Sequence, residues 1–206
     1  MKKQVLVIIG GLDDERMIVW PVSWLWGFWE RAYGIKVVPY YMFWHKTSVE
    51  AFERKIMDAV ALVKGLKSEG YSVSLLGMSA GASAAFNAYY QCKDQVDSLI
   101  NCCGRLRKGG PEIRIRTLDL AAAGSPLFRK SVLSCEEGLS SLGPNDLAKI
   151  LTLRAALDEI VPAQTSVVPG ARNVLLPTIE HTTSIILSMT VFSKLVANFM
   201  RRSWRV

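Results

Sequence analysis

One serine of the chain stands in a setting that suits nucleophilic chemistry. The segment Gly77-Met78-Ser79-Ala80-Gly81 has the pattern G-x-S-x-G. It directly follows an apolar run and directly precedes an alanine-rich stretch. On a sharp turn between a strand and a helix, a serine presents its hydroxyl at the end of the sheet, beside the free amides of the helix N-terminus. We therefore expect Ser79 to be a nucleophile, whereas Ser83, one turn into the helix, is expected to be a packing residue.

A serine needs a neighbouring base to become a nucleophile near neutral pH. The chain has two histidines, His45 and His181. His181 lies between the last apolar run and the last amphipathic stretch, so we expect it on a loop at the same edge of the sheet as Ser79. Thr182 and Thr183, which follow it, are expected to cap the last helix. His45 stands beside two aromatic residues, and a structural or substrate-lining role is expected for it.

The base in turn needs a carboxylate that fixes its tautomer and stabilises its charged form. Asp158 follows the apolar run Ile150–Ala156 and opens the sequence Asp-Glu-Ile-Val-Pro. This position predicts that Asp158 lies at the carboxyl end of the strand before the one that leads to His181. The neighbouring Glu159 is expected to point elsewhere. The alternative is that Asp158 only caps a turn.

Short apolar runs and helical patterns alternate along the chain. The runs predicted as strands are Val5–Ile9, Lys36–Met42, Ser72–Leu76, Ser98–Cys103, Ile150–Ala156 and Asn173–Leu176. The stretches predicted as helices are Val49–Lys67, capped by Ser48, then Ala80–Tyr90, Pro126–Leu142 and Thr183–Arg201. Because the runs lack polar alternation, both faces of each strand should be covered. We predict a three-layer α/β/α sandwich around a mainly parallel sheet of about six strands, with Pro39 at a bend or on an edge strand.

The bulk composition is that of one folded globular domain over residues 1–206. The formal net charge is +7, but the basic residues form only short, scattered clusters, so we expect no nucleic-acid partner. The four cysteines lack metal-ligand spacing, so we expect no metal, and no cofactor is predicted. A reducing, cytoplasmic setting is the simplest interpretation of the cysteine usage. Residues 1–11 are interpreted as a buried first strand rather than a signal peptide, and no run is long enough for a membrane span.

The chain order Ser79, Asp158, His181 on alternating strands and helices resembles the α/β-hydrolase superfamily. The turn at 158–162 resembles the acid-bearing turn of many esterases and lipases in that superfamily. The resemblance covers nearly the whole chain and implies a minimal version of the fold. Because the first strand is close to residue 1, we expect none of the antiparallel strands that often precede it, and because the segment Gly104–Lys149 is short, we expect little or no lid.

In that superfamily two backbone amides usually hold the oxyanion that forms during acyl transfer. One comes from the residue after the nucleophile, which is Ala80 here, and one comes from the loop after the first strand. That loop is Gly10-Gly11-Leu12, in place of the common His-Gly, and its glycines allow the backbone to approach a substrate closely. We take Leu12 as the second donor and Gly11 as the next candidate. A glycine turn without a catalytic role is the alternative.

The segment Met17–Trp29 is unusually rich in aromatic residues. A helix on a parallel sheet buries only one face, so some of these rings should face the mouth of the site or the solvent. We predict that Trp20, Trp24 and Trp26, together with Met78, line a substrate site for an apolar acyl chain. Packing of the rings in the core is the alternative.

These residues together predict a serine hydrolase that cleaves a small-molecule carboxylic ester with an apolar acyl group through an acyl-enzyme. Thioesters and amides share this chemistry, and a thioesterase or amidase is therefore an alternative. A non-catalytic protein that keeps the fold and binds a lipid or membrane surface is the alternative from another class. The aromatic segment and the basic C-terminal end would then contact the lipid. The oligomeric state is not indicated by the sequence.

Overall fold

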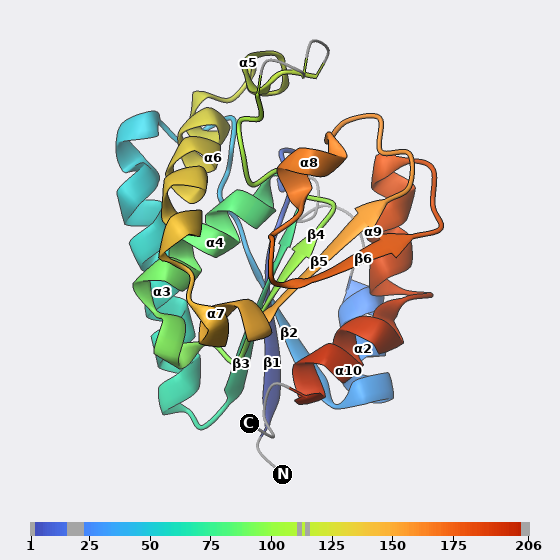
Figure 1. Ribbon diagram of the computed structural model, residues 1–206. Helices are drawn as coiled ribbons and strands as arrows, with labels where there is room; N and C mark the ends of the chain where they lie inside the picture. The colour runs from blue at the N-terminus through green and yellow to red at the C-terminus, as the bar shows by residue number, and fades with distance from the viewer. Residues whose placement is uncertain (1–2, 16–22, 111–112, 114–115, 203–206) are drawn as a thin grey trace.

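A single twisted parallel sheet organises the chain in the computed structural model, which describes residues 3–15, 23–110, 113 and 116–202 (Figure 1). Within these residues the strands are β1 Gln4–Ile9, β2 Ile35–Tyr40, β3 Ser72–Met78, β4 Ser98–Cys102, β5 Ile150–Ala155 and β6 Arg172–Leu176. Their order in the sheet is β2-β1-β3-β4-β5-β6, and every neighbouring pair is parallel. The predicted fold class is confirmed, and Pro39 lies in β2, an edge strand.

Helices cover both faces of the sheet, which gives three layers (Figure 1). One face carries α2 Ser23–Tyr33, α9 His181–Met189 and α10 Ser193–Arg202, and the other carries α3 Phe52–Ser68, α4 Gly81–Gln91 and α6 Pro126–Gly138. Alternate residues of each strand serve the two layers, as in β1, where Val5 and Val7 belong to one core and Leu6 and Ile8 to the other. This double burial is why the strands read as continuous apolar runs.

The face of the sheet to which the chain passes after a strand changes between β1 and β3. After β1 the chain passes to α2 on one face, whereas after β3 it passes to α4 on the opposite face. In such sheets ligands usually bind at the carboxyl ends of the two strands between which this switch occurs. The loop Gly10-Gly11-Leu12 and the turn at Ser79 lie at this switch point.

The strand bounds agree with the prediction to within two residues, but the predicted helix Val49–Lys67 begins differently. It opens with a 3₁₀ turn, Val49–Ala51, before α3, and the side chain of Ser48 makes no capping hydrogen bond. The predicted helix Pro126–Leu142 also divides, into α6 and a 3₁₀ turn at Leu139–Ser141.

The last predicted helix, Thr183–Arg201, is wrong as a single element. The chain forms α9 and α10 instead, bent by 58° at the break between them. In a continuous helix Ser193 would donate to the carbonyl of Met189. That carbonyl instead accepts a hydrogen bond from Trp29 Nε1 at 2.9 Å, and Ser193 donates to Thr190. The hydroxyls of Ser188 and Thr190 bond back to carbonyls one turn earlier, a contact that bends helices.

The segment between β4 and β5 mostly covers the sheet rather than its carboxyl edge. Here α6 packs on α4, and α7 Pro144–Ala148 lies lower on the same side (Figure 1). The short α5 Leu118–Ala121 projects beyond the carboxyl edge. All four cysteines are buried and free, as expected of small core residues.

Candidate active site

Ser79 occupies a strained turn between β3 and α4. Its φ is +51°, a left-handed conformation that non-glycine residues rarely adopt. The Ser79 amide donates to the carbonyl of Cys102 at 3.0 Å, and the Ser79 carbonyl accepts from Ala82 at 3.1 Å. These two bonds fix the backbone, so the strain is held by the flanking strand and helix. The side chain is partly exposed at the carboxyl edge.

The glycines on either side of Ser79 are required by close backbone contacts. A Cβ atom on Gly77 would lie 2.3 Å from Cα of Ala82, and one on Gly81 would lie 2.1 Å from the carbonyl oxygen of Ile9. Real Cβ atoms do not approach other atoms so closely. The pattern G-x-S-x-G therefore follows from packing of this turn against α4 and β1.

His181 is the first residue of α9 and is nearly buried. The prediction placed it on a loop and used Thr182 and Thr183 as caps, and this detail is wrong. Glu180 is the N-cap, and its side chain accepts hydrogen bonds from the amides of both threonines. The amide of His181 donates to Glu159 Oε2 at 3.0 Å. Two carboxylates thus hold the first turn of α9.

Asp158 follows β5 and points at His181. Its Oδ2 accepts from His181 Nδ1 at 2.9 Å, and its Oδ1 accepts from the amides of Ile160 and Val161 at 2.9 and 2.7 Å. Burial favours the neutral carboxylic acid, but the hydrogen bonds from His181 and the two amides outweigh it and hold the pKa of Asp158 below its ordinary value. The carboxylate is therefore ionised at neutral pH and can only accept hydrogen bonds.

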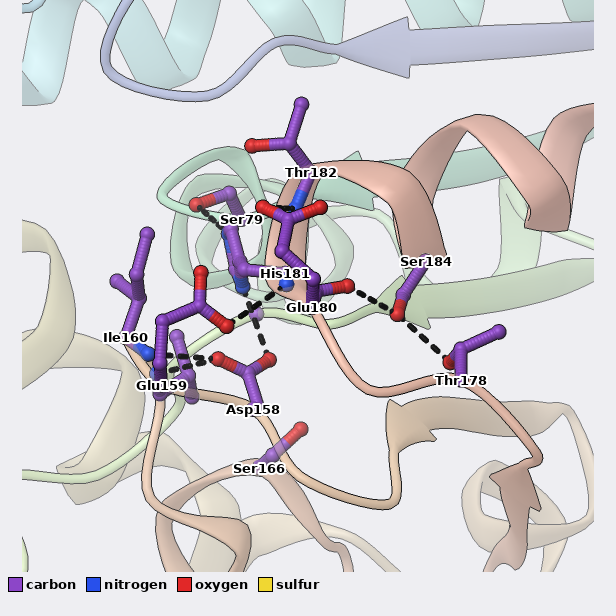
Figure 2. A network of polar contacts seen from close by, with 12 residues as sticks. Ser79, Asp158, Glu159, Ile160, Ser166, Thr178, Glu180, His181, Thr182 and Ser184 are labelled. Carbon is purple, nitrogen blue, oxygen red and sulfur yellow. Dashed lines mark hydrogen bonds and ion pairs between the residues drawn. The ribbon is translucent and has the colours of Figure 1, made fainter.

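Ser79, His181 and Asp158 form one continuous chain of contacts (Figure 2). His181 Nε2 lies 2.8 Å from Ser79 Oγ. Because the Asp158 carboxylate only accepts, Nδ1 of the neutral imidazole carries the proton, and Nε2 accepts from the Ser79 hydroxyl. The structure therefore brings together the three side chains that the sequence singled out, in a geometry suited to removing a proton from Ser79.

The loop after β1 lies against this centre. A Cβ atom on Gly11 would lie 3.2 Å from Cβ of Ser79, so the backbone of the loop passes directly beside the serine. Trp44 Nε1 donates to the carbonyl of Gly10 at 3.1 Å, and the amide of Asp14 donates to the carbonyl of Gly11 at 3.0 Å. Among the described residues, the amides of Leu12 and Ala80 have no protein acceptor. Both amides therefore remain available as donors.

The fold matches those of solved structures that include lipolytic enzymes and an enol-lactonase. A structure of the metagenome-derived lipolytic enzymes LipS and LipT superposes with a TM-score of 0.62 at 14% identity, covering 98% of this chain and 95% of that one. Est1E from Butyrivibrio proteoclasticus has a TM-score of 0.62 at 16% identity and covers 100% and 90%. An enol-lactonase from Burkholderia xenovorans LB400 has a TM-score of 0.57 at 17% identity and covers 98% and 92%.

The chain has an α/β-hydrolase fold. No protein-family model matches it, and a search of curated proteins finds no significant match. The likeness is therefore one of architecture. It extends over nearly the full length of both chains in these comparisons.

In this α/β-hydrolase fold the described part of the aromatic segment, residues 24–29, packs mainly against the core. Trp29 is fully buried, and Trp26 packs against the same core cluster, which also contains Met78. Trp29 Nε1 donates a hydrogen bond to the carbonyl of Met189. Met189 lies eight residues after His181 in α9, about 12 Å further along the helix axis. Trp24 is 60% exposed, and Trp20 lies outside the described residues. The packing alternative thus describes Trp26 and Trp29, and Trp24 is free to meet a ligand.

Three acidic residues of the site were not identified as such from the sequence. Glu159 and Glu180 hold the backbone of α9, as described above. Asp14 is fully buried and accepts from the amide of Phe43 at 2.9 Å, which ties the loop after β1 to the end of β2. Burial raises the pKa of Asp14. In the sequence this residue sits in the run Asp13-Asp14-Glu15-Arg16, where nothing distinguishes it from an ordinary surface acid.

Other predicted roles can be placed as well. His45 Nδ1 lies 2.9 Å from the carbonyl of Gly124, a structural contact. Ser83 is buried and bonds to Ser131, as expected of a packing residue. Among the described residues, no group of three or more His, Cys, Asp or Glu side chains is placed to hold a metal. No single described helix could span a membrane by length and composition, although the bent pair α9 and α10 would pass that test together.

Proposed function

We propose that the protein is a serine hydrolase that cleaves carboxylic esters through a covalent acyl-enzyme. The observation that carries this proposal is the pair of hydrogen bonds at His181, 2.8 Å to Ser79 Oγ and 2.9 Å to Asp158 Oδ2. A serine on a turn with positive φ, a histidine with a fixed tautomer and an ionised, buried carboxylate supply what nucleophilic catalysis by serine needs.

Acylation begins when Ser79 Oγ attacks the ester carbonyl carbon and His181 Nε2 takes the hydroxyl proton. The carbonyl oxygen becomes an oxyanion, and the free amides of Leu12 and Ala80 are the donors that would stabilise it. The ionised Asp158 stabilises the imidazolium without itself taking the proton. The bond between the carbonyl carbon and the alkoxy oxygen then breaks, and His181 returns its proton to the leaving alcohol.

Deacylation repeats the same steps with water. His181 removes a proton from a water molecule, whose oxygen attacks the acyl carbon attached to Ser79. The second tetrahedral intermediate collapses when the bond to Ser79 Oγ breaks, and His181 returns the proton to that oxygen. The products are a carboxylic acid and the regenerated serine. No step requires a group beyond those named and water.

An apolar ester is the substrate class that the surroundings favour. Ile160 is 45% exposed on the loop that carries Asp158, and Ile179 is 74% exposed just before His181. Apolar side chains beside the reacting centre favour a substrate with an apolar part, because contact removes both surfaces from water. The similar solved structures include proteins described as an aryl esterase, carboxylesterases, lipolytic enzymes and an enol-lactonase, which supports an ester over a thioester or amide.

Hydrolysis of p-nitrophenyl esters with two to twelve acyl carbons tests this proposal. We expect turnover by the wild type, with kcat/KM rising with chain length by up to about fourfold per methylene until the apolar contact ends. Ser79→Ala should abolish turnover, whereas Ser68→Ala, a change at an exposed serine of α3, should not affect it. Turnover by the folded Ser79→Ala protein at the wild-type rate, or no turnover of any ester by the wild type, would contradict the proposal.

A further inference from the structure

A cavity lies beside the loop that carries Asp158. Its volume is about 440 Å³, within the range of small-molecule sites. Its walls come from the end of β5, the loop after it, the short helix α8 Ala163–Ser166 and the loop that ends at α5. The residues that matter for its chemistry are Arg116, Arg154, Asp158, Glu159, Gln164 and Ser166. Figure 2 shows Ser166 on the side of Asp158 away from Ser79 and His181, so this cavity is distinct from the space beside the nucleophile.

The cavity presents cationic donors that the protein itself does not use. Arg154 is partly buried, and its guanidinium makes no hydrogen bond or ion pair with any described residue. Arg116 donates one N–H group to the carbonyl of Asp158, which leaves most of its five donors without a protein acceptor. Arg154 is only partly exposed and Arg116 is exposed, so an anion that enters the cavity can accept hydrogen bonds from both guanidinium groups.

Three of the four carboxylate oxygens of Asp158 and Glu159 accept hydrogen bonds from the protein, and Oε1 of Glu159 has no donor among the described residues. Both carboxylate oxygens of Asp158 accept hydrogen bonds, from His181 and from the amides of Ile160 and Val161. Glu159 accepts from the amide of His181. The buried Ser166 hydroxyl accepts from Asn101, and among the described residues its own proton has no acceptor. The unused hydrogen-bonding capacity of the side chains that line the cavity is therefore mainly that of donors.

The arginine side of the cavity is also preorganised. Arg105 is buried, and its guanidinium donates to the carbonyls of Arg107, Lys108 and Arg116 at 2.9 to 3.1 Å. The backbone of Arg116 is thus fixed by a side chain that would otherwise be an isolated buried cation. Arg154 projects from β5, a strand that pairs with β4 on one side and with β6 on the other. A ligand would not have to order either backbone, which reduces the entropic cost of binding.

We propose that this cavity is a binding site for a small organic anion, whose carboxylate or phosphate group is held by Arg154 and Arg116. The planar guanidinium fork fits both groups through paired hydrogen bonds, and Ser166 and Gln164 supply neutral donors at its wall. The proposed contacts use neither Ser79 nor the amides of Leu12 and Ala80, although the cavity shares the loop of Asp158 and Glu159 with the active site.

Calorimetric titration of the intact protein with citrate and with inorganic phosphate, near neutral pH and at about 0.15 M salt, tests this site. The two probes separate the carboxylate and phosphate sources, and glycerol serves as the neutral comparison. We expect a single saturable site for at least one anion. Arg154→Gln should weaken it about tenfold or more, the loss typical of a hydrogen bond to a charged group. Arg154→Lys, which keeps the charge but not the fork, should fall between.

Arg172→Gln is the matched control, because Arg172 is an exposed arginine on β6 outside the cavity and the change in net charge is the same. It should change affinity by no more than about twofold, as expected of a distant surface charge. Ser166→Ala provides a second variant should Arg154→Gln fail to fold, and it should also weaken binding. Ser79→Ala should bind like the wild type. Absence of saturable binding to both anions, or an equal loss in the Arg172 and Arg154 variants, overturns the proposal.

Discussion

Glu159 holds the backbone of His181 while its neighbour Asp158 holds the side chain of the same residue. Glu159 Oε2 accepts from the His181 amide at 3.0 Å, and Asp158 Oδ2 accepts from His181 Nδ1 at 2.9 Å. Consecutive residues of one loop therefore fix both the position of the imidazole and its tautomer. Glu159 acts on the reaction only through His181 and is a positioning residue.

This division of roles predicts different effects at the two carboxylates. Asp158→Asn should lower kcat on the order of 10⁴-fold, because an amide in place of the carboxylate favours the wrong tautomer of His181. Glu159→Ala should lower kcat by no more than about tenfold through loss of one backbone contact at an exposed side chain. Steady-state kinetics on one ester measures both.

Glu159→Gln is the control for this comparison. Glutamine keeps an oxygen that can accept from the His181 amide, so kcat should stay within about twofold of the wild type. A loss at Glu159→Gln as large as that at Asp158→Asn would show that the two carboxylates have been assigned the wrong roles.

The turn at Ser79 predicts an unequal response of two glycines to alanine. Gly81→Ala places a Cβ atom 2.1 Å from the carbonyl oxygen of Ile9, so the free energy of unfolding should fall by about 1–3 kcal/mol or more. At Gly65, in α3, an added Cβ meets nothing within 4 Å. Gly65→Ala should therefore raise stability by about 0.5–1 kcal/mol. Denaturant unfolding measures both, and equal effects would contradict the close packing at Gly81.

Glu180 predicts a pH-dependent contribution to stability. Its hydrogen bonds from Thr183 and Thr182 lower its pKa from 4.5 to about 2. A carboxyl group with a lowered folded pKa stabilises the fold above its unfolded pKa and loses this effect as pH falls through the folded value. The Tm difference between the wild type and Glu180→Gln should thus be present above about pH 5 and shrink towards pH 2.

The control for this titration is Glu69→Gln, at an exposed glutamate whose side chain has no partner among the described residues. Its Tm difference from the wild type should be small at every pH. A difference for Glu180→Gln that does not change between about pH 5 and pH 2 would contradict the capping role of Glu180.

The sequence was informative where residue type is dictated locally. Contacts within a few residues of the turn and with β1 require glycines on both sides of Ser79, so the sequence pattern alone indicates the turn. Continuous apolar runs predicted the parallel sheet because the inner strands β1, β3, β4 and β5 are buried on both faces. The edge strand β6 departs from this expectation, since Arg172, Asn173 and Leu175 are exposed. His181 could be selected because the chain offers only two histidines and one of them follows the last strand.

The sequence was uninformative where distant contacts decide. The break between α9 and α10 depends on Trp29, whose Nε1 donates a hydrogen bond to the carbonyl of Met189, 160 residues away in the sequence. The burial of Asp14 depends on a hydrogen bond from the backbone amide of Phe43, which follows the neighbouring strand β2. Glu159 resembles any exposed glutamate until α9 is placed beside it. Which tryptophan faces the core likewise depends on the rotation of α2 about its axis, which the aromatic composition of the segment does not specify.

The central claim is that Ser79 is a nucleophile activated by His181, and fluorophosphonate labelling of the intact protein followed by peptide mass spectrometry tests it most directly. Attack by Ser79 Oγ on phosphorus with loss of fluoride should leave one adduct, located on Ser79. The same protein with Asp158→Asn should label far more slowly, and Ser79→Ala should not label at all. Absence of an adduct on the folded wild type, or an adduct on another serine with Ser79 unmodified, would contradict the claim.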